Sequence, residues 1–131
     1  GSTEQKRAEV GVDEPTSESR LKERIQVKLV VLPQTTPSGV LKASFWAGVS
    51  VDISGSGIVV GVSGASTDAF QLQSEVRLEI ELSQPWGEIR TLGTIRRVKP
   101  ARTDQKMTML GIDYTGMAES DAKKLKEYLV G

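Results

Sequence analysis

Two sets of polar residues in this chain have the types and spacing of a binding site. Arg20 and Arg24 stand just before the first run of alternating apolar residues. Asp52, Ser54 and Gly57 interrupt a stretch rich in valine and isoleucine, where serine and glycine weaken a strand and a buried carboxylate is costly without a partner. Each set has an ordinary explanation, because turns favour Asp, Ser and Gly and two arginines can form a solvated charged segment. The alternative is a polar site at the mouth of a β-barrel that uses both sets.

The composition excludes several kinds of chemistry. The 131 residues include no histidine, which removes the usual general base near neutral pH, Ser-His catalysis and most transition-metal sites. They include no cysteine, so disulfides and thiolate metal sites are excluded as well. Since no nucleophile–base pair or set of metal ligands is recognisable, we expect a protein that binds without catalysis and needs no cofactor.

Charge and hydropathy limit the partners. The chain has 17 basic and 17 acidic residues, whereas a protein that binds DNA or RNA normally carries a basic excess. Five acids and two bases fall in residues 1–19, so the remainder has 15 bases against 12 acids and tolerates a modestly charged anion. No apolar run approaches the ~20 residues of a membrane span and no signal peptide is visible. We therefore expect no nucleic acid, no membrane insertion by this segment, and a cytoplasmic location, including as the cytosolic domain of a larger protein.

The elements that must position the polar residues follow from periodicity. Alternating apolar residues predict strands over 25–32, 41–53, 57–63, 75–82, 89–98 and 107–114, separated by turns rich in proline and glycine. The second of these is expected to place Val49, Val51 and Ile53 on one face. Short connections imply antiparallel pairing, and closure into a barrel removes the exposed edges.

Both ends of the chain differ from this pattern. Residues 120–130 have an acid in the first turn and an apolar face, which predicts a helix covering an opening or one side of the barrel. Residues 1–19 are polar with little periodicity and are predicted to be a flexible tail or linker, with Gly1 and Ser2 interpreted as a cloning scar. The prediction is an all-β domain over residues 20–131: a six-stranded antiparallel β-barrel with a C-terminal α-helix.

The two polar sets, in this order and on these elements, resemble the signature of the PilZ domain, the bacterial receptor module for cyclic di-GMP. That signature is R-x-x-x-R just before the first barrel strand and D/N-x-S-x-x-G some tens of residues later. Here it is matched by Arg20, Arg24, Asp52, Ser54 and Gly57. The resemblance covers residues about 20 to 130, and it implies a six-stranded barrel with a C-terminal helix that binds cyclic di-GMP.

The resemblance gives each matching residue a role. A guanidinium can fork onto guanine O6 and N7 or onto a phosphate, and can stack on a purine, which fits Arg20 and Arg24. Asp52 would accept from guanine N1–H and the exocyclic amine, Ser54 would add a hydrogen bond, and Gly57 would let the backbone turn close to the ligand.

The resemblance leaves other points open. Residues 19–24 are expected to be mobile until the ligand orders them. Ser19 stands where some members carry another arginine that influences whether one ligand or a stacked pair binds, so the stoichiometry is open. The family regulates exopolysaccharide synthesis, flagellar motors and pili, so the resemblance implies an attached effector domain or a partner protein that serves one of these outputs.

The alternative is an interaction domain of the same fold without nucleotide affinity. It would act through Trp86 or through a basic run near the turn after the fifth strand, which comprises Arg96, Arg97, Lys99, Arg102 and Lys106. The run is interpreted in the first place as a solvated strand end, and otherwise as a second phosphate contact or a dock for an acidic partner.

Overall fold

The computed structural model describes residues 20–21, 24–101 and 106–130. The predicted tail over 1–19, which includes Ser19, lies outside the described residues, as does most of the turn predicted at 100–104. The expected mobility of 19–24 falls partly on residues that are not described. Within the described part of the chain, no helix is long and apolar enough to cross a membrane.

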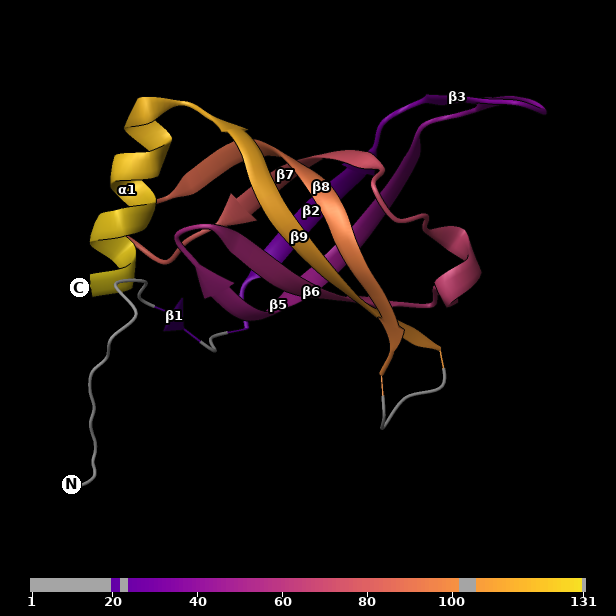
Figure 1. Cartoon of the computed structure of the whole chain (residues 1–131). Coiled ribbons are helices and arrows are strands. Elements are labelled where there is room, and N and C mark those ends of the chain that lie inside the picture. Colours follow the sequence, from indigo (N-terminus) through magenta and orange to yellow (C-terminus); the bar gives the residue numbers. More distant parts are fainter. Residues whose placement is uncertain (1–19, 22–23, 102–105, 131) are drawn as a thin grey trace.

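Six strands close into a barrel (Figure 1). They are β2 (Gln26–Val31), β5 (Ser44–Ser54), β6 (Gly57–Ser63), β7 (Glu75–Glu81), β8 (Glu88–Pro100) and β9 (Met107–Met117). Neighbours are antiparallel in the order β5-β2-β7-β8-β9-β6, and pairing of β5 with β6 joins the two ends of the sheet. The predicted six-stranded antiparallel barrel is therefore confirmed.

Short elements lie outside the barrel. A two-residue strand, β1 (Arg20–Leu21), pairs with the end of β5. The strands β3 (Gln34–Thr36) and β4 (Gly39–Leu41) form a separate hairpin, and Thr67–Ala69 form a turn of 3₁₀-helix, η1. The stretch predicted as one strand over 41–53 therefore belongs to two strands. Leu41 ends β4, where it pairs with Gln34 of β3, and β5 begins at Ser44.

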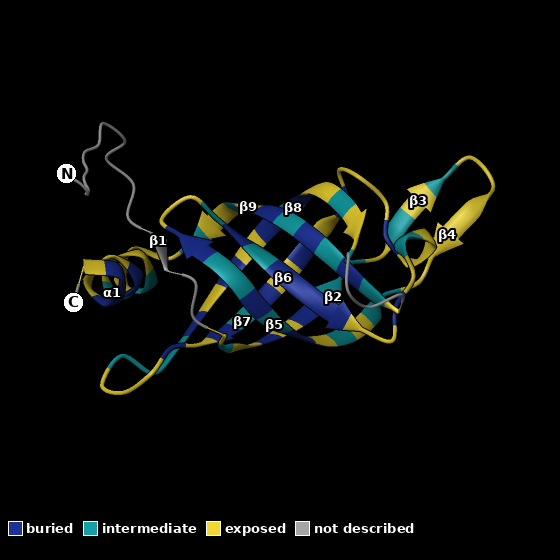
Figure 2. Ribbon diagram, turned by 90° about the horizontal axis from the view of Figure 1, so that it is seen from below, coloured by how far each residue is buried: buried dark blue, intermediate teal, exposed yellow. Residues whose placement is uncertain are grey.

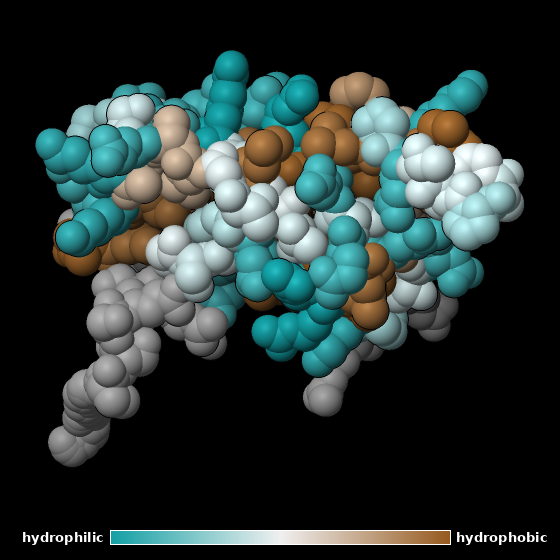
Figure 3. All heavy atoms as spheres, turned by 45° about the horizontal axis from the view of Figure 1, so that its top comes forward, coloured by the Kyte–Doolittle hydropathy of each residue, from teal (hydrophilic) through white to brown (hydrophobic). Residues whose placement is uncertain are grey.

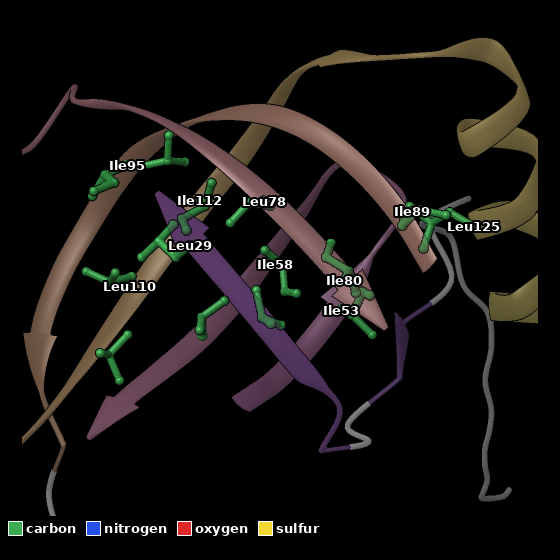
Figure 4. Close-up of a cluster of buried hydrophobic side chains, with 14 of the residues drawn as sticks. Leu29, Ile53, Ile58, Leu78, Ile80, Ile89, Ile95, Leu110, Ile112 and Leu125 are labelled. Atoms are coloured by element: carbon green, nitrogen blue, oxygen red, sulfur yellow. The ribbon is translucent and has the colours of Figure 1, made fainter. Parts of the chain in front are cut away.

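The core is aliphatic, as the low aromatic content requires. Inward-facing side chains of all six strands meet inside the barrel (Figure 4). On β7 the predicted alternation is confirmed: Val76, Leu78 and Ile80 are fully buried, while Glu75 and Arg77 are exposed. Since burial of one such side chain contributes about 1.5–3 kcal/mol, this cluster is the main stabilising element of the fold.

The helix α1 (Glu119–Val130) covers one end of the barrel (Figure 1). Its Leu125 lies beside Ile89 of β8 (Figure 4). Its Tyr128 ring meets Trp86 edge-on, with ring centroids 5.4 Å apart. Lys124 donates to the Glu88 carbonyl at 3.0 Å. Trp86 therefore anchors the helix on the barrel.

The outer surface is mixed in character. On the face shown in Figure 3, hydrophobic atoms form separate patches among hydrophilic ones. Figure 2 shows the barrel from below, where β6 carries no exposed residue before its last one, Ser63. Gly57 and Val59 of β6 are half-buried and line a hollow of the outer surface, which is where the candidate site lies.

Candidate ligand-binding site

The corner between β5 and β6 is fixed by the Ser54 hydroxyl. This oxygen accepts hydrogen bonds from the backbone N–H groups of Ser56 (3.3 Å) and Gly57 (3.2 Å) and donates to the Gly57 carbonyl (3.1 Å). The side chain is buried. These bonds hold the polar turn in one shape, so the structure gives Ser54 a part in shaping the corner that the sequence did not predict.

Gly57 is required by close packing of two backbones. A Cβ at this position would lie 2.6 Å from the Ile112 carbonyl oxygen on β9, a distance that real Cβ atoms do not adopt. The same approach pairs Gly57 with Asp113, and the Tyr114 N–H donates to the Ser56 carbonyl at 3.0 Å. The glycine therefore serves the contact between β6 and β9, which differs from the turn predicted from the sequence.

A bulge in β5 turns Asp52 outward. The pairing with β6 shifts between Ser50, opposite Val60, and Asp52, opposite Val59, so Val51 is an extra residue. Such a bulge re-aims the side chains that follow it. Ser50 and Ile53 are fully buried, while Val51 and Asp52 line hollows on the outer surface. The prediction that residues 49, 51 and 53 share one face is therefore wrong, because the bulge interrupts the alternation.

A second bulge, in β8, turns two successive arginines outward. The pairing with β9 shifts between Ile95, opposite Ile112, and Arg97, opposite Gly111. Ile95 is fully buried, whereas Arg96 and Arg97 are both exposed. Because β8 and β5 flank the pair β9 and β6, the two bulges direct Asp52 and the two arginines to one outer surface.

These residues surround a polar hollow of about 160 Å³. Its polar side chains are Asp52, Ser54, Ser56, Arg96, Arg97 and Asp113. Arg96 is held in place, since its Nε donates to Asp113 Oδ2 at 3.2 Å and its Nη1 donates to Gln73 Oε1 at 2.9 Å. The polar hollow thus combines carboxylates with guanidinium groups at the predicted corner.

A larger apolar hollow of about 420 Å³ adjoins it. The two share Val59, Arg97 and Gly111. The apolar hollow is lined further by Val49, Val51, Gly61, Pro100, Ala101, Met107 and Met109, with Arg24 and Lys99 as additional cations. No acidic residue is among its described lining residues, so it suits an apolar or aromatic group that carries negative charge nearby.

Backbone contacts join both ends of the arginine motif to β5. Through β1 and β5, Arg20 lies opposite Ser54; the Arg20 side chain is outside what the structure describes. Ile25, next to Arg24, makes two hydrogen bonds with Ser50 beside the bulge. Its N–H donates to Ser50 Oγ at 2.9 Å, and its carbonyl accepts from the Ser50 N–H at 2.8 Å. Arg24 itself is exposed and lines the apolar hollow.

The structure thus places Arg24 on the apolar hollow and the Arg20 backbone beside Ser54, while Asp52, Ser54 and Gly57 line the adjoining polar hollow. It also adds Asp113, which the sequence did not assign to the site, and Arg96 and Arg97, for which a second phosphate contact was only the lesser interpretation; Arg102 of the basic run lies outside the described residues. A signal was present, because two successive arginines after Ile95 break the alternation of the strand, as bulges do.

Residues 17–131 match the family model of the PilZ domain. The chain belongs to the PilZ domain family. PilZ domains are regulatory binding modules, generally not enzymes, and no catalytic family is indicated. No curated protein matches the chain in sequence.

Solved structures of PilZ proteins share the fold. The Bacillus subtilis inhibitor of motility MotI/DgrA has a TM-score of 0.67 and 19% identity, with 90% of this chain and 50% of that chain covered. The PilZ domain of YcgR from Escherichia coli, solved with c-di-GMP, has a TM-score of 0.61 and 10% identity, with 89% and 90% covered. The MrkH–c-di-GMP complex of K. pneumonia has a TM-score of 0.59 and 13% identity, with 91% and 52% covered. The chain thus spans about half the length of MotI/DgrA and MrkH, and the likeness concerns the fold.

Proposed function

We propose that this domain binds cyclic di-GMP at the two adjoining hollows and relays binding to an attached effector domain or a separate partner. The observation that carries the proposal is the pairing of Arg20 with Ser54, which brings the arginine motif to the corner that holds Asp52. Membership of the PilZ family supports it, as do the folds of two proteins solved with c-di-GMP.

The chemistry of the motif residues suits this ligand. Asp52 lines the polar hollow, where its carboxylate can accept from guanine N1–H and the exocyclic amine. Arg20 and Arg24 supply forked donors for guanine O6 and N7 or for phosphate. A bidentate base contact is worth about 1–3 kcal/mol, so a few such contacts support specific binding without a chemical step. Ser54 and Gly57 hold the corner that presents Asp52.

The effect of ligand binding would be passed to the effector through β1, which precedes the first barrel strand. In Figures 1 and 2, β1 lies beside α1 at the same end of the barrel. A ligand that bridges the arginine motif and Asp52 would fix β1 in one position, which is an order–disorder type of switch. The effector it serves, in motility or in exopolysaccharide synthesis, belongs to this proposal, as does a cytoplasmic location.

The interaction-only alternative is less well supported by the structure. Trp86 packs on Tyr128, so its ring serves the docking of α1. Arg96 and Arg97 face the polar hollow, and Arg96 is bonded to Asp113. The two features on which that alternative depends thus have other uses, and ligand binding is the function that the geometry favours.

Isothermal titration of the folded domain with cyclic di-GMP tests the proposal, with cyclic di-AMP as the control for base identity. We expect saturable binding of cyclic di-GMP and much weaker binding of cyclic di-AMP, because adenine lacks both the O6 acceptor and the N1–H donor. A folded sample that takes up no cyclic di-GMP would leave the interaction-only function as the better explanation.

A further inference from the structure

Arg97 stands at the junction of the two hollows. It belongs to the lining of both, together with Val59 and Gly111. Among the described lining residues it is therefore the one charged side chain that both hollows share. A ligand that extends from the polar hollow into the apolar hollow has to pass this guanidinium.

The position of Arg97 is set by backbone features. The bulge in β8 turns it outward directly after the exposed Arg96, and its partner across the strand pair is Gly111. A Cβ built on Gly111 would lie 3.3 Å from the Arg97 Cβ and 3.5 Å from its Nε. The Arg97 side chain thus packs over Gly111, which has no side chain of its own. The absence of a Cβ at Gly111 leaves space for the Arg97 side chain.

Arg97 also has its donors available. Its neighbour Arg96 is engaged by Asp113 and Gln73. The Arg97 side chain makes no hydrogen bond or ion pair with any other described residue. A guanidinium carries five N–H donors in a fork that matches the oxygens of a phosphate. This side chain is therefore equipped to receive an anion.

Cyclic di-GMP has the matching arrangement of groups. Its two guanines project from a ring that contains two phosphodiesters, so a negatively charged centre separates two aromatic ends. The site has a carboxylate-bearing hollow at one end, an apolar hollow at the other and Arg97 between them. We propose, on the basis of the proposed function, that Arg97 is a third ligand-binding arginine, outside the two sequence motifs, that contacts a phosphate of the ligand ring.

The test is titration of cyclic di-GMP into the wild-type domain and into Arg97→Ala, Arg97→Lys and Arg77→Ala. Arg77 is an exposed arginine of β7 that lines neither hollow, so it controls for loss of one positive charge. We expect Arg97→Ala to weaken binding about tenfold or more, as for loss of a hydrogen bond to a charged group. Arg97→Lys should retain part of the affinity because lysine keeps the charge, and Arg77→Ala should bind like the wild type.

A second readout identifies the phosphate contact. The salt dependence of the dissociation constant should be less steep for Arg97→Ala than for the wild type, and Arg97→Lys should keep the wild-type dependence. Melting of the unliganded Arg97→Ala domain should match the wild type, because the side chain is exposed and unbonded among the described residues.

The outcomes separate this inference from the proposed function. Wild-type binding with an unchanged Arg97→Ala variant would overturn the role of Arg97 and leave the proposed function standing. Equal losses in Arg97→Ala and Arg97→Lys, with an unchanged salt dependence, would overturn the phosphate contact. Absence of binding by the folded wild type would overturn both.

Discussion

Arg20 lies directly opposite Ser54 where β1 pairs with the end of β5. The first arginine of one motif and the serine of the other thus share one antiparallel pair, although the barrel strand β2 lies between them in sequence. Farther along the same segment, Ile25 is bonded to Ser50. The arginine motif is therefore attached to β5 on both sides of the bulge that turns Asp52 outward.

Replacement of either motif arginine should weaken binding and spare the fold. We expect Arg20→Ala and Arg24→Ala each to weaken cyclic di-GMP binding by about 1–3 kcal/mol, because each removes a forked contact to base or phosphate. Titration calorimetry measures the loss, with Arg77→Ala as the matched control. The melting temperature of the unliganded domain should stay close to the wild type. If both variants bound as tightly as Arg77→Ala, the arginine motif would have no part in the site.

Asp52 should determine base identity. In Asp52→Asn the side chain keeps its size but replaces one acceptor oxygen by an N–H₂ donor, which opposes the donors of guanine N1 and the exocyclic amine. We expect the affinity for cyclic di-GMP to fall by about tenfold or more, since a buried donor left facing a donor costs about 1–3 kcal/mol. Parallel titrations with cyclic di-GMP and cyclic di-AMP measure the change in preference. An unchanged ratio of the two affinities would show that Asp52 does not read the base.

Ser54 should affect stability as well as binding. Its hydroxyl makes three hydrogen bonds within the turn, so Ser54→Ala should lower the free energy of unfolding by about 1–3 kcal/mol. Ser56→Ala is the control, because Ser56 is exposed and takes part in this turn through its backbone N–H. Urea unfolding of both variants measures the difference. Equal unfolding midpoints would mean that the Ser54 hydroxyl does not stabilise the corner.

The barrel was predictable from alternation alone. Residues 57–63 were predicted as a strand and form β6 with the same bounds, with Ile58, Val60 and Val62 buried as expected. On β7 the inward residues were also predicted correctly. These strands have a regular side-chain period of two, so the pattern of burial can be read directly from the residue types.

The two bulges were not predictable in the same way. A period of two continued from the buried Gly48 and Ser50 would place Asp52 inside and Ile53 outside, which is the reverse of what the structure shows. In β8 the bulge places Arg96 and Arg97 on the same side, and so adds both to the site. A bulge depends on how a strand pairs with its neighbour, and a single strand's sequence records that only indirectly. The motif residues were thus recognised, but the two bulges that set their surroundings and bring Arg96 and Arg97 to the site were not predicted.

Gly57 offers the sharpest test of how the corner is built. In Gly57→Ala the new methyl group would lie 2.6 Å from the Ile112 carbonyl oxygen, so β6 and β9 would have to separate. We expect a loss of about 1–3 kcal/mol in the free energy of unfolding, as for other overpacked sites, with weaker ligand binding because Asp52 and Asp113 then move apart. Urea unfolding and titration calorimetry on the same variant measure the two effects.

Gly55→Ala is the matched control for that substitution. Gly55 is in the same turn, but a Cβ there meets no atom within 4 Å. Its stability should therefore lie within about 0.5 kcal/mol of the wild type, as for ordinary surface substitutions. Comparable losses in both variants would indicate that the whole turn requires glycine for its backbone conformation. A loss confined to Gly57→Ala would instead locate the requirement at the contact between β6 and β9, which presents the polar hollow to its ligand.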